Sequence, residues 1–288
     1  MVPLLAALVA VATTNVHTAH AAFPGRNGVI AFEHGGTVAN IFAVKSNGTH
    51  LRRLTQNRHD DIAAAFSPNG KRIAFASSRD GDYEIFVMKA NGKRERQVTH
   101  NAVDDFNPAF SPNGRKIVFE SDRGGHESIV AMRAGGGHQH RITHTSGADD
   151  GQPVYSPSGR KIAFTSDRDG DNEIFTMRAS GADQRQLTHN SIDDRGPDFS
   201  PNGKRIVFQS ARVSPDQTFV MKANGTHQRQ LTDDAEGASG PVYSPNGRQL
   251  AVTEGLDIFK IRSDGTHQRR LTHNTVFAGY PDWQPLPR

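Results

Sequence analysis

The sequence predicts an all-β fold, a six-bladed β-propeller built from four-stranded blades. An aromatic residue followed by Ser-Pro-Asn-Gly, or a close variant, recurs at steps of 44, 45, 44 and 44 residues. Each repeat carries four short strand patterns, and a four-stranded sheet cannot bury both faces unless it stacks on neighbouring sheets. The motif begins at Phe66, Phe110, Tyr155, Phe199 and Tyr243, with a shortened copy at Trp283.

The repeat between residues 153 and 190 shows the expected strands in order. Its strand segments alternate or are rich in β-branched and aromatic residues, and the turns between them carry Pro, Gly, Asn and Asp where tight turns need them. We expect strands at residues 153–155, 161–166, 173–177 and 185–188, separated by turns at residues 156–159, 167–171 and 179–181.

The two ends of the chain supply complementary parts of one blade. Residues 27–32 match the second strand of the repeat, so the chain enters a blade that lacks its first strand. The segment at residues 280–285 matches that missing strand. We therefore expect residues 281–286 to pair beside residues 29–33, which closes one domain over residues 22–288 and removes unpaired sheet edges.

Other recurring residues have structural interpretations. The aromatic residues are expected to pack between blades, and the proline found two positions before five of them to begin the innermost strand. An arginine lies 13 residues after four of the aromatic residues, and we expect it to form an ion pair between blades or to bind carbonyl oxygens, with ligand binding as the alternative. These arginines are Arg79, Arg123, Arg168 and Arg212.

Composition narrows the classes of function. The 34 basic and 30 acidic residues give a formal net charge of +4, a mixed surface that does not predict a nucleic-acid partner. The absence of cysteine excludes disulfides, thiolate zinc sites and cysteine nucleophiles. The sequence also lacks a Gly-x-Ser-x-Gly elbow, a phosphate-binding glycine loop and a His-Glu-x-x-His motif.

Residues 1–21 are expected to be a signal peptide. The apolar run at residues 2–12 is about half of the roughly 20 residues that span a bilayer, so no membrane span is expected. The small residues Ala19 and Ala21 fit a cleavage site, whereas the first three residues lack the usual basic group. We therefore expect the mature protein in the periplasm or outside the cell.

The repeat resembles the WD40-like repeat, or PD40 repeat, of the TolB family. The resemblance rests on Pro-x-aromatic-Ser-Pro-Asn-Gly-(Lys/Arg)-x-Ile-(Ala/Val)-Phe-x-Ser-Asp-Arg, followed by Asn-Gly-x-x-x-Arg-x-(Leu/Ile/Val)-Thr-His, and covers residues 24–288. It extends to the C-terminal propeller of TolB and not to the α/β domain that precedes that propeller. The resemblance implies a docking surface for partners such as the peptidoglycan-associated lipoprotein.

Recurring acidic pairs and histidines are the candidate binding residues. Because the strands of a blade alternate in direction, we expect these residues on one rim of the ring and the Lys/Arg-rich turns on the opposite rim. Such an acidic rim would attract a basic partner or a divalent ion, and docking would weaken below about pH 6.5, where imidazole gains a proton. The predicted rim comprises Asp60, Asp61, Asp104, Asp105, Asp149, Asp150, Asp193, Asp194, His100, His144 and His189.

Two acidic loops are candidate calcium sites, because each places carboxylates at alternating positions around a glycine. Neither has the spacing of a complete EF-hand loop, and the favoured interpretation is a turn held by bonds between Asp side chains and nearby amides. The candidate ligands are Asp80, Asp82 and Glu84 in one loop, and Asp167, Asp169, Asp171 and Glu173 in the other.

These observations favour a non-catalytic, exported binding scaffold without an obligatory cofactor. The expected partner is a protein or an envelope polymer, and the propeller itself is expected to be a monomer. The alternative is a metal-dependent glycan-active enzyme, a lyase or hydrolase built on the same fold. Recurrence of the acidic residues in register favours the scaffold, because a structural repeat produces that regularity.

Overall fold

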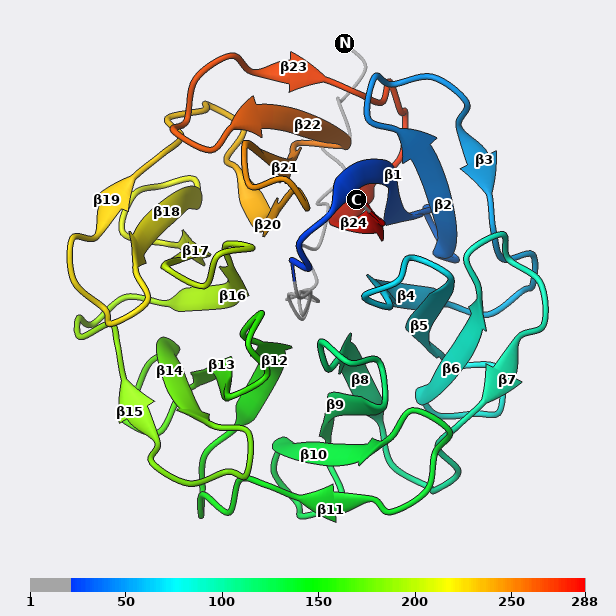
Figure 1. Ribbon diagram of the computed structural model, residues 1–288, viewed down its shortest axis with the longest axis vertical. Coiled ribbons are helices and arrows are strands. Elements are labelled where there is room, and N and C mark those ends of the chain that lie inside the picture. Colours follow the sequence, from blue (N-terminus) through cyan, green and yellow to red (C-terminus); the bar gives the residue numbers. More distant parts are fainter. Residues whose placement is uncertain (1–21, 288) are drawn as a thin grey trace, which may run out of the picture.

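The computed structural model describes residues 22–287. Its strands form six antiparallel sheets, each of four strands, arranged radially around a central axis (Figure 1). The predicted all-β, six-bladed propeller is confirmed. Among the described residues, no helix is long and apolar enough to cross a membrane.

The blades follow one another along the chain, and the strands of each blade lie in order from the innermost to the outermost. Blade 1 contains β24 (Ala278–Leu286), β1 (Arg26–His34), β2 (Asn40–Lys45) and β3 (Arg52–Arg53). Blade 2 contains β4 (Asp61–Phe66), β5 (Arg72–Ser77), β6 (Glu84–Lys89) and β7 (Arg96–Gln97). Blade 3 contains β8 (Asp105–Phe110), β9 (Lys116–Ser121), β10 (Ser128–Arg133) and β11 (His140–Arg141).

The remaining three blades have the same order. Blade 4 contains β12 (Asp150–Tyr155), β13 (Lys161–Ser166), β14 (Glu173–Arg178) and β15 (Arg185–Gln186). Blade 5 contains β16 (Asp194–Phe199), β17 (Arg205–Ser210), β18 (Gln217–Lys222) and β19 (Arg229–Gln230). Blade 6 contains β20 (Ser239–Tyr243), β21 (Gln249–Glu254), β22 (Asp257–Arg262) and β23 (Arg269–Arg270).

Blade 1 closes the ring with strands from both ends of the chain (Figure 1). Strand β24 pairs antiparallel with β1, with Trp283 opposite Ile30 and Leu286 opposite Arg26. The predicted closure is therefore confirmed, and pairing extends beyond the expected segments to Ala278 and His34.

Every innermost strand contains an irregularity next to a residue with positive φ. In β12, for example, the register shifts between Gly151 and Val154, and Gln152 has a φ of 51°. Proline follows this residue in five blades, so it lies inside the strand and not at its start as predicted. The positive-φ residues are Ala63, Asn107, Gln152, Gly196, Gly240 and Tyr280.

In five of the six blades, the irregularity turns a backbone N–H toward the preceding blade, where a polar side chain accepts its hydrogen bond. The blade before blade 3 has Ala76 at the acceptor position. The backbone N–H of Gln152 donates to the Glu120 carboxylate at 3.0 Å, and the backbone N–H of Tyr280 donates to the Thr253 hydroxyl at 3.1 Å. A buried N–H without an acceptor would destabilise the fold, which explains why polar residues interrupt the apolar second strands. These bonds join adjacent blades around the axis.

The recurring aromatic residues fill the space between blades. Phe66 is 2% exposed and belongs to a core cluster with Ala31 and Ile41 of blade 1 and Ile73 of its own blade. The equivalent residues of the other blades are buried as well, at most 3% exposed. Their predicted packing between blades is confirmed.

Candidate functional site

The strand pairing places the acidic pairs at one end of the blades and the Lys/Arg-rich turns at the other. In blade 2, Asp61 pairs with Ser77 at one end of the β4–β5 ladder, and Phe66 pairs with Ile73, beside Arg72, at the other. The acidic pair therefore lies on one face of the ring and the Lys71–Arg72 turn on the opposite face. Blades 3, 4 and 5 repeat this register. We call the end that carries the acidic pairs the acidic face.

The second aspartate of each pair is buried inside its blade. Asp105 is 0% exposed, and Arg123 donates to it at 3.1 Å. These ion pairs join elements of one blade, which differs from the predicted contact between blades. The reason is that the arginine follows the second strand, which lies beside the strand that the aspartate begins. The four pairs are Arg79–Asp61, Arg123–Asp105, Arg168–Asp150 and Arg212–Asp194.

The first aspartate of each pair accepts a hydrogen bond from the backbone of the preceding blade. The Tyr83 N–H donates to Asp104 at 2.8 Å. The corresponding bonds run from Ala39 to Asp60, from Glu127 to Asp149 and from Asn172 to Asp193, at 2.7, 3.0 and 2.9 Å. These four carboxylates remain half-exposed, whereas the second aspartates are inaccessible to a partner. Of the residues predicted to form the binding rim, a partner can therefore reach only the first aspartate of each pair and the histidines.

The predicted histidines lie at the same end of the blades, each after the buried threonine that ends its fourth-strand segment. His100, His144 and His189 are all exposed. The threonine before each one accepts a hydrogen bond from the third strand, as Thr99 does from the Ile85 N–H at 2.7 Å. That bond fixes the backbone and leaves the imidazole at the surface.

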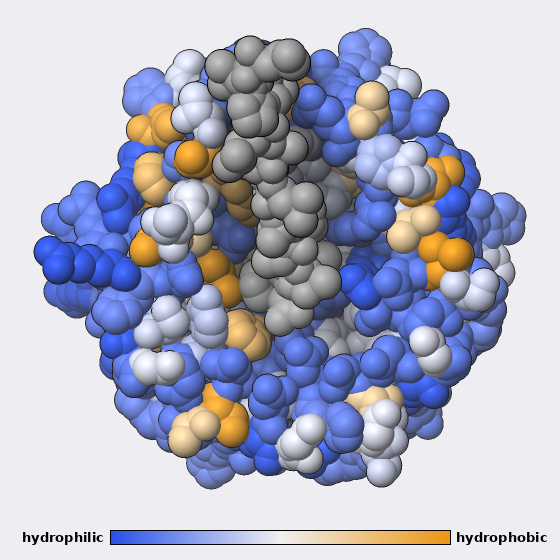
Figure 2. Space-filling model, turned by 180° about the vertical axis from the view of Figure 1, so that it is seen from behind, coloured by the Kyte–Doolittle hydropathy of each residue, from blue (hydrophilic) through white to orange (hydrophobic). Residues whose placement is uncertain are grey.

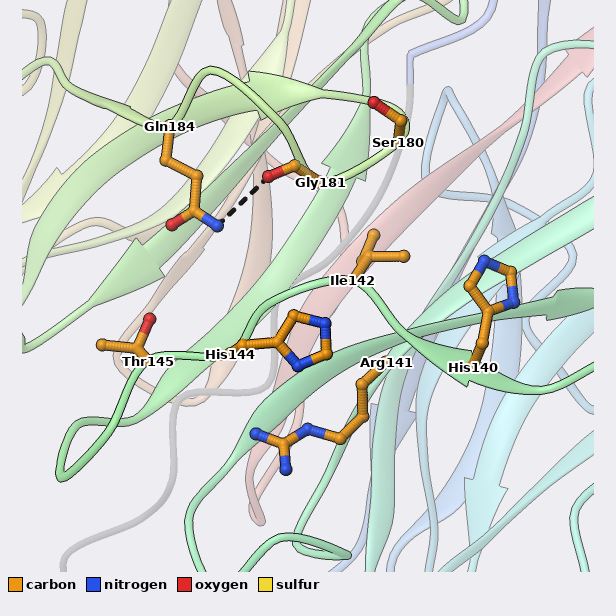
Figure 3. Close-up of a pocket in the computed structure, with 8 residues that line it drawn as sticks. All are labelled: His140, Arg141, Ile142, His144, Thr145, Ser180, Gly181 and Gln184. Atoms are coloured by element: carbon orange, nitrogen blue, oxygen red, sulfur yellow. Dashed lines mark hydrogen bonds between the residues drawn. The ribbon is translucent and has the colours of Figure 1, made fainter.

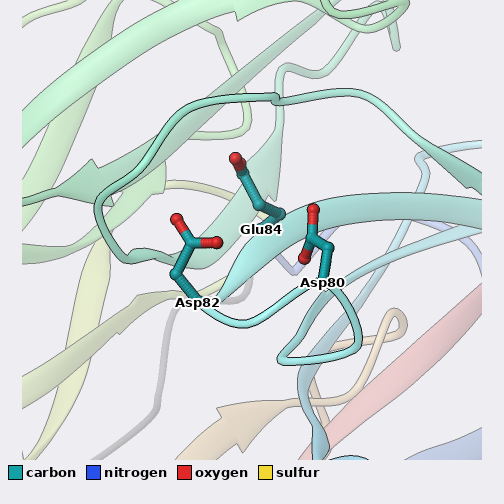
Figure 4. Close-up of side chains that lie close together, drawn as sticks. All are labelled: Asp80, Asp82 and Glu84. Atoms are coloured by element: carbon teal, nitrogen blue, oxygen red, sulfur yellow. The ribbon is translucent and has the colours of Figure 1, made fainter.

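One of the two candidate metal loops gathers its carboxylates. Asp80, Asp82 and Glu84 place ligand oxygens within 4.8 Å of one another (Figure 4). Burial raises the pKa of Glu84 to about 7, and burial together with Asp80 raises the pKa of Asp82. One oxygen of Asp82 is buried without a hydrogen-bond partner. Such a group could hold a hard cation through oxygen ligands.

In the equivalent loop of blade 4, the carboxylate oxygens do not all lie as close to one another as in blade 2. Asp169 accepts a hydrogen bond from Gln186, and Glu173 accepts one from the Asn190 side chain at 3.0 Å. One oxygen of Asp171 is buried without a hydrogen-bond partner, as in blade 2. Asp167 faces away from this group, since its carboxylate accepts a bond from the Asp149 N–H at 2.7 Å. Among the described residues, only Asp80, Asp82 and Glu84 gather their ligand oxygens within 4.8 Å, and the blade 4 loop does not.

A group of buried carboxyl groups near the inner strands was not predicted. Burial raises the pKa of Glu33 to about 8, and the nearby Glu120 raises the pKa of Glu127 to about 9. Glu120 also accepts a hydrogen bond from the Asn107 side chain at 2.9 Å. The sequence signal is weak, because Glu33 and Glu120 occupy a strand position that is Ala, Thr or Gln in the other blades.

Two further carboxyl groups connect blades toward the opposite end of the inner strands. Asp282 accepts a hydrogen bond from the Phe66 N–H at 2.6 Å, and Asp198 accepts one from the Tyr243 N–H at 2.7 Å. Burial raises the pKa of both, that of Asp282 to about 8. Asp198 also accepts a bond from the Ala22 N–H at 3.3 Å.

One face of the ring is mainly polar where the described residues form it (Figure 2). Figure 2 shows the face turned away in Figure 1, where apolar residues are scattered among hydrophilic ones. Large exposed apolar side chains among the described residues are few and lie in separate loops: Leu51, Ile192, Val213, Leu256 and Val276. A partner of this surface would therefore be recognised through polar and charged contacts.

These features define a class of protein: a closed propeller of repeated four-stranded blades with its charges divided between two faces. Residues 28–152 and 144–286 match the family model of the TolB beta propeller domain. The chain belongs to this family. No curated protein matches the sequence.

Solved structures share the fold at low sequence identity. TolB from Acinetobacter baumannii superimposes with a TM-score of 0.79 at 23% identity, covering 90% of this chain and 67% of that one. A putative TolB from Agrobacterium tumefaciens gives 0.71 at 20% identity, covering 90% and 99%. Hydrazine synthase from Kuenenia stuttgartiensis gives 0.75 at 15% identity, covering 92% and 48%. These likenesses support the fold and do not specify an activity.

Proposed function

We propose that this protein is an exported, non-catalytic scaffold that binds a protein or an envelope polymer through the acidic face of its propeller. The observation that carries the proposal is the division of charge between the two faces. Asp60, Asp104, Asp149 and Asp193 are half-exposed at one end of the blades, and the exposed basic turns lie at the other. Convergent negative charge on a rigid ring attracts a cationic surface and increases the rate of encounter.

Membership of the TolB propeller family supports this role, and the predicted leader supports export. Residues 1–21, which contain that leader, lie outside the described residues. Export is tested by N-terminal sequencing of the protein recovered from the periplasmic or culture fraction. A mature chain beginning at Ala22 supports the proposal, and a full-length chain confined to the cytoplasm contradicts it.

Binding is tested with two sets of charge-neutralising substitutions. The first replaces Asp60, Asp104, Asp149 and Asp193 with Asn, which keeps an acceptor for the backbone bonds between blades. The second, as the matched control, replaces Lys71, Arg115, Arg160 and Lys204 on the opposite face with Gln. Both sets change exposed or half-exposed residues only.

The assay is binding of the purified protein to an isolated envelope fraction at low salt, where surface electrostatics are least screened. We expect saturable binding that the first set weakens by about tenfold or more and the second leaves nearly unchanged. Equal loss in both sets, or no saturable binding, contradicts the proposal. Melting temperatures establish that the rings remain folded.

The compact carboxylate group at Asp80, Asp82 and Glu84 favours one other function, a metal-dependent enzyme that acts on glycans. The test is incubation with uronate-containing and other polysaccharides, with and without divalent ions. Turnover that EDTA abolishes and Asp82→Asn removes would favour the enzyme over the scaffold.

A further inference from the structure

Arg141 differs from its counterparts in the other blades. It lies on the outermost strand β11, opposite Val130 of β10. The same position holds glutamine in three blades, namely Gln97, Gln186 and Gln230, and arginine in two, namely Arg53 and Arg270.

In blades 2 and 4, this position is paired with an aspartate of the loop between the second and third strands. Gln97 donates to Asp80, and Gln186 donates to Asp169. In blade 3, Gly124 occupies the aspartate position. A Cβ atom placed on Gly124 would lie 2.4 Å from Nη1 of Arg141. The guanidinium therefore lies where the other two blades place their carboxylate.

Arg141 also has none of the compensating contacts of the other two arginines. Nε of Arg53 donates to the Thr55 carbonyl at 2.7 Å, and Nε of Arg270 donates to the Thr272 carbonyl at 2.9 Å. Nε of Arg141 is buried without a hydrogen-bond partner, and no ion pair of this guanidinium forms among the described residues. A buried N–H without an acceptor is unfavourable, and because the Arg141 side chain is only half-buried, the rest of its guanidinium is available to an external acceptor.

Two adjoining hollows meet at this residue. One has a volume of about 320 Å³ and the other about 400 Å³, and both are lined by Arg141, His144 and Thr145. Figure 3 shows the His144 imidazole beside the Arg141 side chain, with Gln184 of blade 4 across the hollow. The site is concave, polar and open to solvent.

The acidic loop has also lost its other carboxylates in blade 3. His126 replaces the position of Asp82, and Ser128 replaces that of Glu84. The acidic groups that remain near His126 include Asp122 and Asp149, and Nδ1 of His126 lies 3.6 Å from the Asp149 carboxylate. The loop thus carries fewer carboxylates than in blade 2, and Asp122 and Glu127 are the ones that remain.

We propose that the hollow around Arg141 binds an oxyanion, a carboxylate or phosphate group carried by the ligand. The planar guanidinium can donate two parallel hydrogen bonds to such a group, and this geometry matches carboxylate and phosphate oxygens. His144 and Thr145 supply further polar contacts from the same loop. This site lies on the acidic face and includes His144, but its test uses anionic probes and does not depend on binding of a cationic partner.

The test uses acetate and inorganic phosphate as separate probes, titrated into the ¹⁵N-labelled protein at constant ionic strength. We expect saturable NMR shifts of the Arg141 side-chain Nε–H and of the backbone around residue 144, with one of the two probes binding more tightly. Arg141→Gln installs the residue of blades 2, 4 and 5 and should weaken binding by about tenfold or more. Gly124→Asp restores the carboxylate of blade 2 and should compete with the probe to a similar extent.

Gly124 is suited to this substitution because its φ lies outside the left-handed region and the close atom is the end of a flexible side chain. Arg185→Gln, an exposed arginine on the equivalent strand of blade 4, is the control for net charge and should bind like the wild type. Non-saturable shifts with both probes, or unchanged affinity in Arg141→Gln, would overturn the proposal. A melting curve for each variant separates loss of binding from loss of fold.

Discussion

Arg123 and Asp105 form an ion pair within blade 3, in which Nη2 of the arginine lies 3.1 Å from both carboxylate oxygens. Nε of the same arginine donates to the Ser121 hydroxyl at 2.8 Å, and its guanidinium lies 5.3 Å from the centre of the Phe119 ring. The arginine thus connects the beginning of the innermost strand to the end of the second strand. Blades 2, 4 and 5 repeat this ion pair.

Arg123→Met tests this contact, because it leaves the buried Asp105 carboxylate without its cation. Removing one partner of a buried ion pair typically costs about 3 kcal/mol or more, so we expect a loss of that order in the free energy of unfolding from urea denaturation. Arg115→Met, an exposed residue on the opposite face, is the control and should change stability by about 0.5 kcal/mol or less. Adding Asp105→Asn to Arg123→Met should recover part of the lost stability. Equal stability of the Arg115 and Arg123 variants would show that the Arg123–Asp105 ion pair does not stabilise the fold.

The second prediction concerns ring closure through β24. Deletion of residues 279–288 removes the strand that pairs with β1 and leaves an open edge in blade 1. We expect the truncated chain to lose its sharp thermal transition and to aggregate. Deletion of residues 287–288 alone should leave the melting curve nearly unchanged, and a sharp transition at the wild-type temperature in the longer deletion would refute the closure.

The sequence predicted the fold because each blade is specified by local signals repeated in register. Turn residues fix the hairpins, the aromatic residue fixes the inter-blade contact, and the two half-blades fix the closure. The irregularity at Gln152 and its counterparts could not be read in the same way. In five blades it comes with an acceptor in the preceding blade, such as Glu120, whose type differs from blade to blade. In blade 3 it occurs without one, because the position is Ala76.

The acidic face was predicted in its position but not in its accessibility. Nothing in an Asp-Asp pair distinguishes the buried member from the exposed one. A signal was nevertheless present, because the buried aspartate and its arginine are separated by 18 residues in four blades. The aspartate position is Ala238 in blade 6 and Ala278 in blade 1. The aspartate and the arginine therefore occur together in the same four blades, which indicates that they contact each other.

The third prediction concerns the contact between blades 1 and 2 at Asp282. Its carboxylate is 4% exposed and accepts the Phe66 N–H, so Asp282→Ala would leave a buried donor without an acceptor. We expect a loss of about 1–3 kcal/mol in the free energy of unfolding. Asp282→Asn retains an acceptor and should cost less at neutral pH. If the two variants are equally stable, the hydrogen bond does not contribute as the structure indicates.

The fourth prediction is that the protein becomes less stable as the pH rises from mildly acidic to mildly alkaline values. Burial raises the pKa of Glu33 and that of Asp282 to about 8, from ordinary values of 4.5 and 3.8. Between these limits the folded state holds protons that the unfolded chain has released, so the free energy of unfolding falls as pH increases, and it levels off once the folded groups have ionised. The stabilisation is complete below the unfolded pKa values and is lost through about pH 8.

Urea denaturation at about pH 5.5, 7 and 8.5 measures this dependence, whose slope can reach about 1.4 kcal/mol per pH unit for each group. Glu33→Gln keeps an acceptor for the Ala63 N–H, which donates to Glu33 at 3.3 Å, and removes the titration. Combined with Asp282→Asn, it should reduce the slope and stabilise the protein most at the alkaline end. Other carboxyl groups, such as Glu84, whose pKa burial raises to about 7, keep part of the slope. An exposed carboxylate provides the control, since Asp233→Asn should leave the slope intact. A profile that rises with pH, or a slope that the double variant does not reduce, would show that Glu33 and Asp282 do not keep their protons in the folded ring.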